Sequence, residues 1–161
     1  ETLYNTIKYM PEKIKINVHY IGDHAEFVKR VGRLDNAVYT GYLNKEELND
    51  YLTHNIDALY LSLNSEYLGY CLPSKLFAYI GYSLPIIGYL PKGDASDIIL
   101  NNKFGVVARL GEISQLKNQI VKMLNPKFYN YCIKNLKQKR EKFEQSNTLN
   151  DLIVLLNERS N

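Results

Sequence analysis

Residues 73–89 read PSKLFAYIGYSLPIIGY and follow an apolar run at 56–63. The run at 56–63 is almost continuously apolar, which is typical of a strand covered on both faces. Pro73 suits the first position of a helix, where an N–H would lack a partner, and we expect the helix at 75–82. A second apolar strand is expected at 85–89. This strand–helix–strand order predicts a right-handed parallel βαβ unit.

The same alternation extends outward in both directions. We expect further strands at residues 15–21, 37–40 and 104–108. We expect further helices at residues 2–10, 23–31, 44–55, 94–100, 112–124, 126–143 and 147–158. The pattern predicts one Rossmann-like, doubly wound α/β domain over residues 1–161, with a parallel sheet of about five to six strands flanked by helices and a helical C-terminus.

Composition and charge exclude several classes of protein. With 20 Lys and Arg against 17 Asp and Glu, the net charge of +3 is too balanced to predict binding to nucleic acid. The three histidines and two cysteines lack metal-ligand spacing, so no metal site is expected. Cys71 and Cys132 are interpreted as thiols in a reducing compartment such as the cytoplasm. The first residues lack the features of a signal peptide, and the missing initial Met suggests a piece of a longer protein.

Ligands of a doubly wound sheet bind beyond the carboxyl ends of its strands, and the loop at 64–72 follows one of these ends. It leads into Pro73, Ser74 and Lys75, where free N–H groups and the helix dipole favour an anion. Ser74 adds a hydroxyl and Lys75 adds a positive charge, and a diphosphate placed there would lie over the strand ends. Glu66 is a candidate acceptor for sugar hydroxyls. The alternative is an ordinary helix start with a solvated Lys and Glu.

Other motifs are weak or absent. Gly22 follows the strand at 15–21 and would let a ligand approach the backbone closely. The sequence contains no Gly-x-Gly-x-x-Gly, no Walker A motif and no Gly-x-Ser-x-Gly, so neither a classical dinucleotide site nor a hydrolase elbow is supported. The tyrosines expected in strand-end loops, where they can stack on a sugar or base, are Tyr42, Tyr67, Tyr70 and Tyr89.

Residues 72–90 resemble the Pro-Ser-Lys-x-x-Glu-Tyr-x-x-x-Gly-x-Pro-Val-Ile segment of group 1 (family 4-like) glycosyltransferases. Segments on both sides resemble the same family in order and spacing. They are Ile21-Gly22-Asp23, residues 38–43 with Glu46-Glu47-Leu48, Asp57-Ala58, and Phe104-Gly105-Val106-Val107. The resemblance covers nearly the whole chain and corresponds to the C-terminal, donor-binding domain of a two-domain enzyme of the GT-B architecture.

The resemblance implies a retaining transferase that moves a sugar from a nucleotide-diphosphate sugar to a sugar or lipid-linked acceptor, as in bacterial polysaccharide or glycoconjugate synthesis. It implies neither a metal nor another cofactor. By this resemblance the donor-binding residues are Gly22, Asp23, Gly41, Tyr42, Glu66, Tyr67, Leu68, Gly69, Pro73, Ser74 and Lys75. Acceptor-side catalytic groups belong to an N-terminal domain, so residues 1–161 alone should show no transfer and at best weak nucleotide binding.

Two residues depart from the family pattern. Ala78 replaces the glutamate that grips the nucleotide ribose, and Ser83 replaces a glycine. The first departure leaves open a catalytically degenerate partner subunit. A flavodoxin-like signalling module is a further alternative, but Gly22-Asp23 and Asn64-Ser65 lack its acidic cluster. The basic segment 134–143 adds possible contact with the inner face of a membrane, against the alternative of a solvated helix face.

Overall fold

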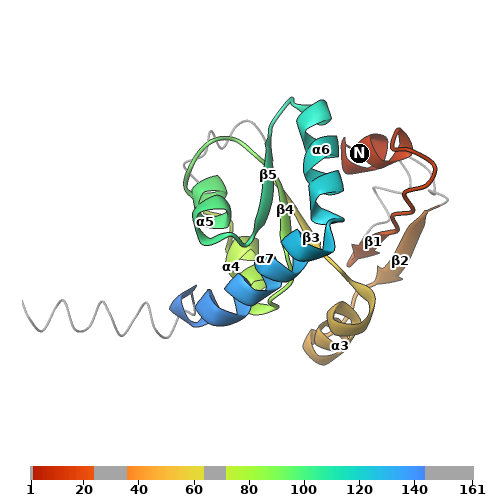
Figure 1. Cartoon of the computed structure of the whole chain (residues 1–161). Coiled ribbons are helices and arrows are strands. Elements are labelled where there is room, and N and C mark those ends of the chain that lie inside the picture. Colours follow the sequence, from red (N-terminus) through yellow and green to blue (C-terminus); the bar gives the residue numbers. More distant parts are fainter. Residues whose placement is uncertain (1, 24–35, 64–71, 144–161) are drawn as a thin grey trace, which may run out of the picture. The chain divides into compact units, whose positions relative to one another are not determined.

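The computed structural model describes residues 2–23, 36–63 and 72–143 (Figure 1). The chain divides into two compact units, residues 1–56 and residues 57–161. Each unit contains described helices and strands that pair in parallel, so the chain belongs to the α/β class. The expected helix at 147–158 and most of the one at 23–31 lie outside the described residues.

The first unit contains a two-stranded parallel sheet and two described helices. The elements are α1 (Thr2–Lys8), β1 (Val18–Ile21), β2 (Ala37–Gly41) and α3 (Lys45–Asn55). Val18 pairs with Ala37 at the start of the register, and an irregularity follows Tyr20. Buried apolar side chains come from α1, the segment after it, β1 and α3: Ile7, Met10, Val18 and Leu52.

The start of α3 follows directly from its sequence. The side-chain oxygen of Asn44 accepts hydrogen bonds from the N–H groups of Glu46 and Glu47, each at 3.0 Å. The Glu47 carboxylate accepts the N–H of Asn44 at 2.8 Å, which completes a capping box. This local exchange of hydrogen bonds confirms the helix start predicted at residue 44.

The second unit contains a three-stranded parallel sheet in the order β3 (Leu59–Ser62), β4 (Ile86–Leu90) and β5 (Gly105–Arg109). Its helices are α4 (Ser74–Gly81), α5 (Asp94–Asn102), α6 (Ile113–Met123) and α7 (Pro126–Lys139), followed by a 3-10 turn, η2 (Arg140–Phe143). In Figure 1, α4 and α5 lie on one side of this sheet and α6 lies on the other. We call the side where these strands begin the amino edge, and the side where they end the carboxyl edge.

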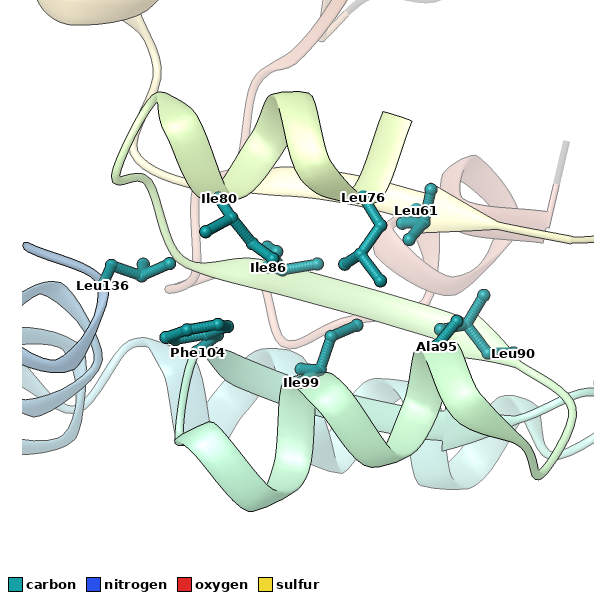
Figure 2. Close-up of a cluster of buried hydrophobic side chains, with 9 residues drawn as sticks. All are labelled: Leu61, Leu76, Ile80, Ile86, Leu90, Ala95, Ile99, Phe104 and Leu136. Atoms are coloured by element: carbon teal, nitrogen blue, oxygen red, sulfur yellow. The ribbon is translucent and has the colours of Figure 1, made fainter. Parts of the chain in front are cut away.

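One apolar cluster joins the sheet to α4, α5 and α7 (Figure 2). Its side chains are Leu61, Leu76, Ile80, Ile86, Leu90, Ala95, Ile99, Phe104 and Leu136, each at most 4% exposed. The apolar positions of α4 recur at Leu76 and Ile80, one helical turn apart, so both side chains reach the sheet. Burial of this kind is the main stabilising contribution to a domain of this size.

Several expected boundaries differ from the observed ones. Pro73 is the N-cap of α4 rather than its first helical residue, because its extended backbone already lies outside the helix. The helix expected at 126–143 changes to a 3-10 turn after Lys139. Within the described residues the five strands pair as sheets of two and three, whereas the sequence predicted one sheet. Periodicity identifies strands but carries little information about which edges pair.

Candidate functional site

The start of α4 lies at the carboxyl edge of the three-stranded sheet. Figure 2 shows Leu76, in the first turn of α4, close to Leu61 near the end of β3. Ile80, one turn later, lies near Ile86, where β4 begins. The helix therefore runs back from the carboxyl edge to the amino edge, as a parallel crossover requires. Its N-terminus occupies the edge at which ligands bind in open α/β sheets.

The first turn of α4 keeps donor groups available to an anion. Pro73 has no side-chain acceptor, and no side-chain hydrogen bond caps the helix in the part of the chain that the structure describes. The N–H of Leu76 donates to the Pro73 carbonyl at 2.9 Å. The two amides before it, those of Ser74 and Lys75, have no hydrogen-bond partner among the described residues. Ser74 and Lys75 are both exposed. This turn also contains no acidic residue, so its field favours negative charge.

The starts of α5 and α6 differ from that of α4. Two acids, Asp94 and Asp97, occupy the first turn of α5, and the Ser96 hydroxyl accepts the N–H of Gly93 at 3.0 Å. The N-cap of α6 is Glu112. Carboxylates at these two helix starts repel a phosphate and occupy the positive end of the dipole themselves. Among these three helices, only α4 begins without an acid.

The structure brings together four predicted site residues of the first unit. The N–H of Gly22 donates to the carbonyl oxygen of Gly41 at 2.7 Å, just beyond the ends of β1 and β2. Both glycines have positive φ, +110° and +73°, and space for a Cβ exists at each, so backbone conformation rather than crowding favours glycine. Asp23 and Tyr42, the next residue after each glycine, are exposed. These residues form one open turn pair at the carboxyl ends of two neighbouring strands.

The loop with the remaining predicted donor-binding residues lies outside the described residues. This applies to Glu66, Tyr67, Leu68 and Gly69, and also to Tyr70 and Cys71. The described candidate residues therefore form two groups, which are Gly22, Asp23, Gly41 and Tyr42 in the first unit and Pro73, Ser74 and Lys75 in the second.

One predicted ligand-stacking residue has a structural role instead. Tyr89 is only 7% exposed, and its hydroxyl accepts the N–H of Gly111 at 2.6 Å. The ring is thus held inside the second unit, and the expectation that it stacks on a sugar is wrong. The sequence alone could not show this, because the partner of Tyr89 lies 22 residues away.

Tyr79 of α4 and Tyr82, the C-cap of this helix, are both partly buried. The Tyr79 hydroxyl donates to the Tyr60 carbonyl at 3.4 Å, and burial raises the pKa of Tyr79 above its ordinary value. Tyr82 is half-buried.

Ala78 is exposed on α4, where its methyl group offers no hydrogen bond to a ligand. A polar side chain at position 78 would lie one helical turn after Ser74.

Other chemistry has little support in the described part of the chain. No group of three His, Cys, Asp or Glu side chains there could hold a metal ion. Burial raises the pKa of the Cys132 thiol to about 11, so it remains protonated at neutral pH and is a poor nucleophile. None of the helices within the described ranges has the length and apolar character needed to cross a bilayer.

No protein-family model matches the sequence, and no curated protein matches it either. The functional interpretation therefore depends on the residues and on their placement in the fold.

Proposed function

We propose that residues 1–161 form the nucleotide-sugar-binding domain of a retaining glycosyltransferase with the GT-B architecture. On this proposal both units belong to one Rossmann-like, doubly wound domain, and the enzyme works in the cytoplasm. It transfers a sugar to a sugar or lipid-linked acceptor in the synthesis of a bacterial polysaccharide or glycoconjugate. A second domain supplies the acceptor site and the catalytic groups, so residues 1–161 alone are inactive.

The start of α4 is the observation that carries this proposal. It lies at the carboxyl edge, it contains no acid, and Ser74 and Lys75 are exposed there. A diphosphate at this position would accept hydrogen bonds from the helix amides and the Ser74 hydroxyl, with the Lys75 ammonium nearby. Stabilising negative charge on a leaving diphosphate is the function that such donors would serve in a metal-free transferase.

Gly22 and Gly41, in the first unit, are a second group of residues proposed to contact the nucleotide. Nothing lies within 4 Å of the Cβ position of either glycine. Because glycine has no side chain, a nucleotide could approach the backbone closely at both turns. Tyr42, at 85% exposed, offers a ring on which a base or sugar can stack. The proposed roles of Glu66, Tyr67, Leu68 and Gly69, in holding the donor sugar, derive from the family resemblance alone.

Ala78 favours a second candidate function. Because it cannot accept a hydrogen bond from a ribose hydroxyl, the chain would bind nucleotide weakly and could serve as a degenerate partner subunit of an active transferase. Replacing Ala78 with Glu separates the two possibilities. A gain of about 10-fold or more in nucleotide affinity would indicate a lost ribose contact, because a hydrogen bond to a charged group contributes about 1.5–3 kcal/mol.

Calorimetry with UDP, GDP and ADP tests the proposed site. Lys75→Ala should weaken binding of the preferred nucleotide about 5- to 10-fold. This effect lies in the lower part of the range for a charge-assisted contact, because Lys75 is exposed and water screens its charge. Lys127→Ala is the matched control, since it removes an exposed lysine from α7. Equal affinity of the Lys75 variant and the unchanged protein would remove Lys75 from the site. Robust sugar transfer by residues 1–161 alone would contradict the assignment of catalytic groups to another domain.

A further inference from the structure

Helix α7 runs across the amino edge of the three-stranded sheet. Near its start, the Tyr129 hydroxyl donates to the carbonyl of Asp57, which precedes β3, at 3.1 Å. Leu136 lies near Phe104 and Ile86, where β5 and β4 begin (Figure 2). At its end, the Lys139 ammonium donates to the carbonyl of Asn102, the last residue of α5, at 3.4 Å. These contacts attach one face of α7 to the edge opposite the proposed nucleotide site.

The other face of α7 is basic. Lys127, Tyr131, Lys134 and Lys137 are exposed, and their spacing of four, three and three residues places them on one side of the helix. The side chains of Cys132 and Leu136 are fully buried on the opposite side. The helix contains four lysines and no acidic residue, and η2 adds Arg140, Glu141 and Lys142. We call Lys127, Tyr131, Lys134 and Lys137 the basic face.

The lysines of the basic face have no structural partner among the described residues. The one described salt bridge joins His54 to Asp50 on α3, in the other unit. Within α7, only Lys139 uses its ammonium in a described hydrogen bond, to the end of α5. Three like charges along one helix face are mutually repulsive, and no carboxylate of the helix offsets them. Among the described residues, these three ammonium groups therefore contribute no ion pair or side-chain hydrogen bond to the fold.

The second unit concentrates positive charge more than the whole chain suggests. The described residues of this unit, 57–63 and 72–143, contain twelve Lys and Arg against five Asp and Glu, although the whole chain has a net charge of only +3. Three of these five acids, Asp94, Asp97 and Glu112, stand at the starts of α5 and α6, at the carboxyl edge. Asp57 precedes β3 at the amino edge. Helix α7 and η2 supply six of these twelve basic residues and one of the five acids, Glu141.

We propose that the basic face of α7 docks on an anionic lipid bilayer. Its three lysines span about 15 Å along a straight helix, which suits a flat, negatively charged surface. Tyr131, 49% exposed between the lysines, has the amphipathic ring that prefers the headgroup layer. The face consists of lysines rather than the arginines that favour bidentate contacts with nucleic-acid phosphates. This proposal depends only on α7 and holds whether or not the nucleotide site is correct.

Vesicle flotation with the 161-residue chain tests the proposal. The vesicles contain phosphatidylcholine alone or phosphatidylcholine mixed with phosphatidylglycerol, at low ionic strength. We expect binding to the mixed vesicles only, with most of it lost at 0.5 M salt because the charges are screened. Each lysine near an anionic surface contributes about five-fold, so a variant with Lys127→Gln, Lys134→Gln and Lys137→Gln should bind about 100-fold more weakly.

A second triple variant controls for net charge. Lys13→Gln, Lys15→Gln and Lys45→Gln remove three exposed lysines from the first unit and should leave vesicle binding nearly unchanged. Circular dichroism of both variants checks that the fold is retained. Equal losses in the two variants, equal binding to both kinds of vesicle, or tighter binding to single-stranded RNA at matched phosphate concentration would each overturn the proposal.

Discussion

The amide of Gly111 donates a hydrogen bond to the hydroxyl of Tyr89 at 2.6 Å and thereby ties the turn after β5 to β4. Gly111 has a φ of +86°, a conformation that glycine adopts without strain. The contact lies at the carboxyl edge, where the predicted ligand site was expected to use the Tyr89 ring. The sequence predicted that Tyr89 stacks on a ligand, but its hydroxyl instead holds the turn that precedes α6.

Tyr89→Phe tests the structural role of this contact. The variant keeps the buried ring but leaves the Gly111 amide without its partner, so the free energy of unfolding should fall by about 1 kcal/mol. Tyr42→Phe is the control, because Tyr42 is 85% exposed. Urea denaturation measures both. A Tyr89→Phe protein as stable as the unchanged chain would show that the hydrogen bond contributes nothing.

Ser83→Gly should stabilise the protein. Ser83 has a φ of 57°, in the left-handed region that costs a non-glycine residue about 1 kcal/mol, and its buried hydroxyl has no hydrogen-bond partner among the described residues. The substitution removes both costs, and the flexibility of glycine in the unfolded chain offsets part of the gain. We expect a net increase of about 0.5–1 kcal/mol in the free energy of unfolding.

Ser83→Ala separates the two causes, because it removes the hydroxyl but keeps the strained backbone. Thermal denaturation should rank Ser83→Gly above Ser83→Ala in midpoint temperature. The reverse order would mean that backbone strain at position 83 is negligible. Glycine would adopt the φ observed at this position without strain.

Gly105→Ala should be strongly destabilising. A Cβ at Gly105 would overlap the backbone of Ile86, its partner at the start of the β4–β5 pairing. Because backbone atoms of paired strands cannot move aside cheaply, we expect a loss of about 3 kcal/mol or more. Gly81→Ala is the matched control, since nothing lies within 4 Å of its Cβ and alanine favours a helix. Similar stabilities of the two variants would contradict the observed β4–β5 register.

The buried thiol of Cys132 predicts a loss of stability at alkaline pH. Burial raises its pKa to about 11 from an ordinary value of 9.0, so the unfolded chain releases this proton first as pH rises. The contribution is therefore fully present below pH 9 and is lost between pH 9 and 11. Denaturation across this range, compared with Cys132→Ala, isolates the effect from other titrating groups. An identical pH dependence of the two proteins would exclude the thiol as a cause.

Short-range features were predictable from the sequence. The capping box at Asn44, the strand at 86–90 and the apolar positions of α4 depend on residues a few positions apart. Hydrophobic periodicity and cap chemistry act over these distances, so they can be read from one chain. The start of α4 at the carboxyl edge also follows, because a parallel crossover requires it.

Contacts between distant segments were not predictable. The sequence does not show that Tyr89 binds Gly111, that Tyr129 reaches Asp57, or that the described strands pair as two sheets. Each depends on packing among segments many residues apart, and many pairings satisfy the same hydrophobic pattern.

By itself, then, the amino-acid order determined the α/β class, most helices and strands of the described residues, and the chemistry available at Pro73–Lys75. Only the tertiary structure decided that Tyr89 is buried and that α7 crosses the amino edge with Lys127, Lys134 and Lys137 exposed. The physical reason is that local backbone preferences act within a few residues, whereas burial and edge placement are set by the whole packed unit.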